Sequence, residues 1–254
     1  MENSNENEKS MTSETGLGLL ETSLAIGLCK KKGIEDSPEV ISDTQKALER
    51  LYKAFDAIAK EASLKVDELN SLRLLTNTLD EAHGNFGKDK ISFEKFVSSL
   101  ADETFEVQVK SVDPLEYFSD IGNIASVESL QKERDELPAE IRAISNPKER
   151  AARLINYIDE DHHVGVDHDM FVRDLERGKD HNATMRYLLG FIARGEALNP
   201  GFVGRFVGVR EKYGVSKTGE ALDGTHRAVA ALVTGEKYFV IEVNMDEIMR
   251  PVAI

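Results

Sequence analysis

A short box near the C-terminal end combines the groups that a phosphate site needs. It reads Leu222-Asp223-Gly224-Thr225-His226-Arg227 and precedes an apolar, alanine-rich stretch. That stretch predicts a short helix, whose first N–H groups carry partial positive charge. Glycine lets a ligand approach the backbone closely, and the three residues after it add side-chain donors. We therefore predict a phosphate site; the alternative is a tight turn capped by the threonine.

The residues upstream of this DGTHR box (Asp223 to Arg227) extend the pattern. Between residues 187 and 243 come a helix-forming stretch that ends in Arg194-Gly195, a strand led by Pro200, and then the box. This order resembles the ParB/sulfiredoxin superfamily. In that family the box grips nucleotide phosphates, so the resemblance implies ATP or another nucleotide, with Mg²⁺, as the cofactor. Sulfiredoxins carry a reactive cysteine where this chain has Thr225, and the only cysteine here is Cys29. Sulfinic acid repair by that route is therefore not expected.

The resemblance implies a nucleotide-dependent phosphotransferase or an NTPase. The nucleotide-binding residues would be Gly224, Thr225, His226 and Arg227. The imidazole and the guanidinium would also stabilise the charge that develops during transfer. Asp223 and Glu196 are the candidates for the catalytic base or a Mg²⁺ ligand. Some relatives are nucleases, an activity that the charge of this chain disfavours.

A second resemblance comes from an internal repeat. The sequence ISFEKFVSSL (91–100) aligns without a gap with VDHDMFVRDL (166–175), and each follows a helix-forming stretch. The order resembles a pair of EF-hands, in which loop oxygens bind calcium. Candidate metal ligands in the second loop are Asp159, Asp161, His163, Asp167 and Asp169. The twelfth position holds Met170, and Lys95 takes the corresponding place in the first loop, so the bidentate carboxylate is missing from both. We expect a degenerate pair that keeps its helix packing; zinc or manganese is the alternative to calcium at this cluster.

Composition limits the partners. The chain has 254 residues and a formal net charge of −14, and the acidic excess lies in the first 200 residues. An acidic body repels a polyanion, which disfavours nucleic acid as a partner. One cysteine excludes an internal disulfide and favours the cytoplasm, with export by a specialised secretion system as the alternative. No apolar run reaches the length of a membrane span.

The expected elements give an α+β fold: a mostly helical N-terminal body and a small mixed α/β, ParB/sulfiredoxin-like C-terminal domain. Apolar spacing predicts helices at 43–62, 67–79 and 180–193, and Asn146-Pro147 is a strong helix start. Alternation predicts strands at 104–112 and 238–243. The domain ranges are 1–40 (disordered tail and amphipathic segment), 41–178 (helical domain) and 179–254 (α/β domain). The alternative function is a non-catalytic module, including a secreted effector-type protein, whose acidic helical surface binds a protein partner.

Overall fold

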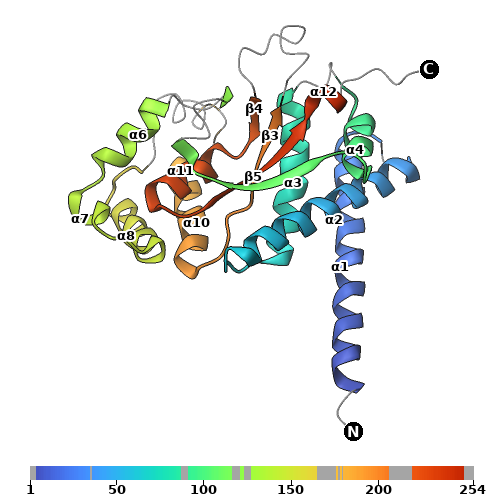
Figure 1. Ribbon diagram of the computed structural model, residues 1–254, viewed down its shortest axis with the longest axis horizontal. Helices are drawn as coiled ribbons and strands as arrows, with labels where there is room; N and C mark the ends of the chain where they lie inside the picture. The colour runs from blue at the N-terminus through green and yellow to red at the C-terminus, as the bar shows by residue number, and fades with distance from the viewer. Residues whose placement is uncertain are drawn as a thin grey trace. The chain divides into compact units, whose positions relative to one another are not determined.

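The computed structural model describes residues 4–34, 36–86, 91–115, 121–122, 127–164, 176, 178, 180–205 and 219–248. These residues form an α+β fold in which helices predominate and five strands make one sheet (Figure 1). The predicted fold class with a helical body is thereby confirmed. The chain divides into two compact units: unit 1 is Met1–Lys53 with Glu68–Glu106, and unit 2 is Ala54–Asp67 with Val107–Ile254.

Unit 1 is helical. Its helices are α1 (Ser4–Lys31), the first part of α2 (Pro38–Glu61), α3 (Glu68–Phe86) and α4 (Phe93–Ala101). The predicted three- and four-residue spacing places one face of each of α2 and α3 in the core, including Leu48, Leu51, Leu72, Leu75 and Leu79. The helix α1 begins within the stretch that we expected to be disordered, because no proline or glycine interrupts the chain before Gly16.

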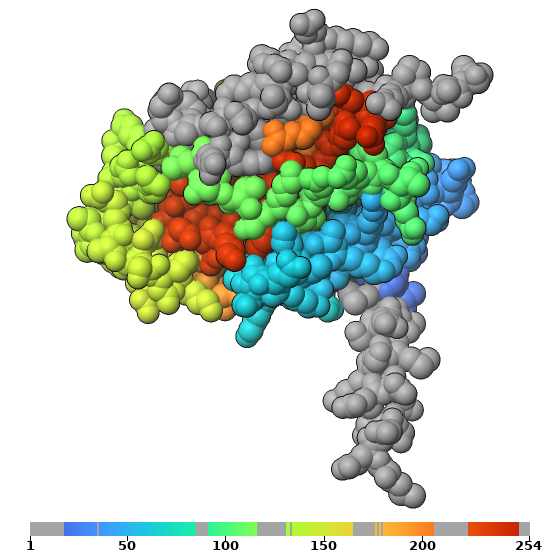
Figure 2. Space-filling model, viewed as in Figure 1, coloured from blue at the N-terminus to red at the C-terminus, as the bar shows by residue number. Residues whose placement is uncertain are grey.

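Unit 2 contains the sheet, in the order β1-β5-β3-β4-β2. The strands are β1 (Val107–Val112), β2 (Ile121–Gly122), β3 (Gly201–Arg205), β4 (Gly219–Asp223) and β5 (Tyr238–Asn244). The sheet is mixed: β5 pairs antiparallel with β1 and parallel with β3, whereas β3 and β4 are antiparallel. β1 is an edge strand, and Figure 2 shows it in green at the molecular surface. Because β1 joins this sheet, unit 2 begins well before the boundary that we placed at residue 178.

Besides the end of α2, six helices among the described residues belong to unit 2. They are α6 (Val127–Glu136), α7 (Ala139–Arg142), α8 (Pro147–Asp159), α10 (His181–Arg194), α11 (Thr225–Thr234) and α12 (Met245–Ile248). The predicted starts of α8 and α10 are confirmed, with Asn146 and Asp180 as side-chain caps. Helices α8, α10 and α11 share one core cluster with Tyr238 and Val240 of β5. The neighbouring β5 residue, Phe239, belongs to a second cluster and makes an edge-to-face contact with Phe55.

Ion pairs around one buried carboxylate join three strands of this sheet. Glu242 of β5 is 6% exposed, and its carboxylate accepts hydrogen bonds from Lys110 of β1 and Arg205 of β3. Two cations thus offset the cost of burying one carboxylate. Among the described residues, no helix is both long enough and apolar enough to cross a membrane.

Candidate functional site

The DGTHR box lies where β4 runs into α11. Asp223 is the last residue of β4, Gly224 caps the helix, and Thr225 is its first residue. Gly224 has a φ of 111°, a backbone conformation that favours glycine. The predicted strand–glycine–helix order is therefore present, and the threonine is not the cap. The capping residue of α11 is a glycine and has no side chain to bond to the helix start, whereas the side chains of Ser92, Asn146 and Asp180 cap α4, α8 and α10.

Protein atoms occupy the space beside Gly224. A Cβ atom added there would lie 2.6 Å from the Cα atom of Gly201 and 2.7 Å from the Oη atom of Tyr238. A Cβ atom on Gly201 would lie 2.0 Å from the same Oη atom. The tyrosine hydroxyl donates a hydrogen bond of 3.1 Å to the carbonyl oxygen of Gly224. On this side both glycines are thus required by packing within the protein, not by the approach of a ligand.

Tyr238 fixes the turn before α11 from inside the core. Its side chain is fully buried, and burial raises the pKa of its hydroxyl, which therefore stays protonated and can donate. Sequence reasoning did not single out Tyr238 or Gly201. Each looks like an ordinary strand residue, and only the arrangement of β3, β4 and β5 brings them to the box.

The two cationic candidates of the box have different partners. Arg227 is 9% exposed, and its guanidinium forms an ion pair with Asp223 four positions earlier. His226 is half-buried, and its ring lies against the ring of His181, with 5.3 Å between the centroids. The sequence predicted that the guanidinium and the imidazole would act on one phosphate. The structure instead holds the guanidinium on a carboxylate of the protein.

His181 is a further residue of this site that the box alone did not indicate. It is the first residue of α10 and is buried, and its Nε2 atom lies 3.1 Å from the carbonyl oxygen of Val164. A carbonyl oxygen only accepts, so Nε2 carries the proton and the ring is held in one orientation. The starts of α10 and α11 therefore lie close together. The carboxylate of Asp180 caps α10 itself.

Glu196 is engaged elsewhere. Its carboxylate accepts two hydrogen bonds from Arg194, at 2.9 and 2.8 Å. These bonds raise the pKa of the arginine. The backbone on either side of Glu196 pairs with Lys65, through hydrogen bonds to and from Gly195 and Ala197. Glu196 is thus bound to its neighbours rather than to the DGTHR box.

The predicted metal ligands are only partly described. Asp159 forms an ion pair of 2.8 Å with Arg186, and His163 shares a hydrogen bond of 3.1 Å with Asn182. Asp161 is exposed and has a φ of 65°. Within the described ranges, no three His, Cys, Asp or Glu side chains are grouped so that they could hold a metal ion. Asp167 and Asp169 lie outside the described residues, as does the second half of the internal repeat.

Comparisons of the chain with protein families, with curated proteins and with solved structures found no match.

Proposed function

We propose that unit 2 binds a phosphate group of a nucleotide at the start of α11. One observation carries the proposal: a strand–glycine turn leads into a helix start whose capping residue has no side chain, and this first turn carries the half-exposed groups of Thr225 and His226. A helix start of this kind attracts anions through its N–H groups and its dipole. The imidazole of His181 lies beside that of His226 and adds a second ring to the site.

Phosphate binding is the first step of the proposal, and catalysis does not have to accompany it. The guanidinium of Arg227 lies 3.3 Å from the position of a Cβ atom on Gly224, so its charge is close to the helix start. The ion pair with Asp223 offsets part of that charge and holds the turn. A role for Asp223 as a base or Mg²⁺ ligand requires its carboxylate to leave the guanidinium. Phosphotransferase or NTPase activity is therefore the second step of the proposal.

The test is a charge change at the first residue of α11. Thr225→Asp places a carboxylate where it favours the helix by about 0.3–1 kcal/mol and repels a phosphate. Thr225→Asn, of similar size and neutral, is the matched control. ATP, CTP or pyrophosphate should raise the melting temperature of the native chain and of the Asn variant, and not that of the Asp variant. Equal shifts in both variants, or no shift in the native chain, would overturn the proposal.

A nucleotide ligand and the buried thiol of Cys29 fit a reducing, cytoplasmic compartment, with export by a specialised system as the alternative. The second candidate function is a protein-binding module. It is favoured by a surface cleft on unit 1 that is lined by three cationic and two acidic side chains, and it does not depend on α11.

A further inference from the structure

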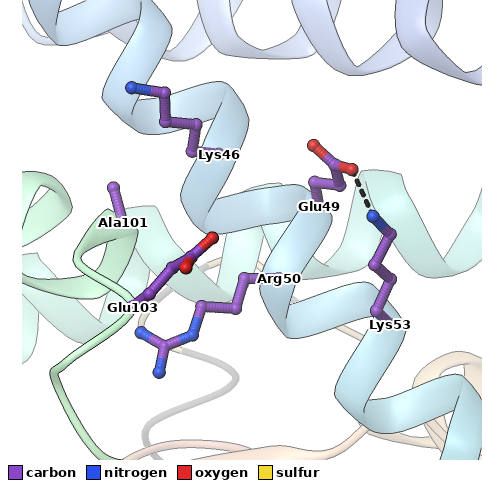
Figure 3. A pocket seen from close by; sticks show the side chains of 6 residues that line it. All are labelled: Lys46, Glu49, Arg50, Lys53, Ala101 and Glu103. Atoms are coloured by element: carbon purple, nitrogen blue, oxygen red, sulfur yellow. Dashed lines mark hydrogen bonds and ion pairs between the residues drawn. The ribbon is translucent and has the colours of Figure 1, made fainter.

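Unit 1 has a surface cleft that lies outside the site described above. Its volume is about 320 Å³. Lys46, Glu49, Arg50 and Lys53 of α2 form one wall, and Ala101 and Glu103 at the end of α4 form the other (Figure 3). The three cations sit at spacings of four and three along α2, so they share one helix face.

The middle cation of the cleft is fixed in place. The Nη1 atom of Arg50 donates hydrogen bonds of 3.0 Å to the carbonyl of Leu100 and 2.7 Å to that of Asp102. Its Nη2 atom donates to the carbonyl of Phe105. The guanidinium thereby satisfies carbonyl groups at the end of α4 and stabilises the wall formed by Ala101 and Glu103. The two walls of the cleft are thus joined by hydrogen bonds within unit 1.

The outer two cations are exposed to solvent. The side chains of Lys46 and Lys53 are 62% and 71% exposed. Lys53 pairs with Glu49 one turn earlier, and Lys46 lies 3.9 Å from Asp43. Pairs of this kind within one exposed helix contribute only a few tenths of a kcal/mol. A stronger or better placed carboxylate can therefore replace them.

The spacing of the lysines defines the ligand. Lys46 and Lys53 are seven positions apart, about 10 Å along the axis of α2. Acidic side chains on one side of an extended peptide lie an even number of positions apart, and at four positions they are about 13 Å apart, which the flexible lysine side chains can span. Unit 1 contains 18 acidic and 11 basic residues, so this cationic face differs from the charge of the unit around it. We propose that the cleft between α2 and the end of α4 binds an acidic peptide segment of a partner protein, with carboxylates on Lys46 and Lys53.

The second wall of the cleft carries an acidic side chain, which gives a substitution with the opposite expected effect. Glu103 extends towards α2 in Figure 3 and forms no ion pair within the described residues. Its carboxylate opposes an acidic ligand. Glu103→Gln should therefore tighten binding, whereas Lys46→Gln and Lys53→Gln should each weaken it.

The experiment titrates the full chain with two peptides and follows its amide NMR signals at low salt. One peptide is acetyl-Gly-Asp-Gly-Gly-Gly-Asp-Gly-amide, and the other carries the two acids side by side. The first should bind more tightly, and its binding should weaken as salt screens the charges. Each lysine substitution should weaken it about two- to fivefold, the range of an exposed ion pair. Lys60→Gln is the matched control, because Lys60 makes the same type of one-turn pair, with Asp56, outside the cleft.

Three results would overturn the proposal. They are the absence of saturable binding at millimolar peptide, equal binding of both peptides, and equal effects of Lys53→Gln and Lys60→Gln. Tripolyphosphate that bound at these lysines more tightly than the spaced peptide would also overturn it, in favour of a phosphate ligand. Melting temperatures of all variants separate loss of binding from loss of folding, and none of these positions belongs to the site at α11.

Discussion

The contact between Gly201 and Tyr238 gives a test of how unit 2 positions the start of α11. Gly201→Ala would place a Cβ atom 2.0 Å from the Oη atom of Tyr238, whose side chain is fully buried and has no space to withdraw. Overpacking of this kind costs about 1–3 kcal/mol. Tyr238→Phe removes the hydrogen bond to the carbonyl of Gly224, which keeps a second bond from the amide of Ala228. That loss should cost about 1 kcal/mol.

The double variant should be more stable than Gly201→Ala alone. Without the hydroxyl, the nearest remaining atoms would be 3.1 Å from the new Cβ atom, at the Cζ atom of residue 238 and the carbonyl oxygen of Asp223. Small shifts relieve contacts of that length. We therefore expect the double variant to cost about 1–2 kcal/mol less than the sum of the two single substitutions.

Urea denaturation followed by circular dichroism measures the cycle. Gly190→Ala is the control within the same unit, because its Cβ atom would meet only the end of the Arg194 side chain, at 3.3 Å. In the middle of α10 this change should be neutral or stabilise by up to about 1 kcal/mol. If the effects of Gly201→Ala and Tyr238→Phe add to within about 0.5 kcal/mol, the two residues are not coupled and the packing argument fails.

Three further predictions concern buried polar groups. Burial lowers the pKa of His83, so its imidazole takes up a proton at higher pH in the unfolded chain than in the folded one. The free energy of unfolding should therefore fall as the pH drops below 6.5. His83→Gln should make the urea midpoint depend less steeply on pH. A slope unchanged by the substitution would contradict this. Glu242→Gln should cost about 2 kcal/mol, because Lys110 and Arg205 lose their shared carboxylate, and an unchanged urea midpoint would refute it. Burial also raises the pKa of the Cys29 thiol, so iodoacetamide should label it only after unfolding; rapid labelling of the native chain would count against its burial.

Local signals predicted most of the helices. The cap at Asn146 with proline after it, and a helix from about residue 180, were predictable because a helix start depends on residues within one turn. The strand at 104–112 was readable from alternation, and the structure forms it as Val107–Val112. The strand that pairs with it could not be predicted, because Val107 pairs with Val243 at the far end of the chain. That pairing also explains why the division into units differs from the expected ranges.

The same distinction holds at the candidate site. The turn at Gly224 and the helix from Thr225 follow from the box itself, since glycine permits the φ of 111° and alanine-rich sequence favours helix. The box also contains both members of the ion pair between Asp223 and Arg227, four positions apart. The contact of His226 with His181 does not follow from the box, because α10 brings His181 to it.

By itself, then, the sequence determined where helices start, where strands alternate, and that a glycine turn opens α11. These depend on interactions between residues close in the chain. Only the tertiary structure decided that Tyr238 and Gly201 fill the space beside that turn, and that cations of α2 face the end of α4. Such contacts join residues far apart in sequence, and the packing of whole elements fixes them.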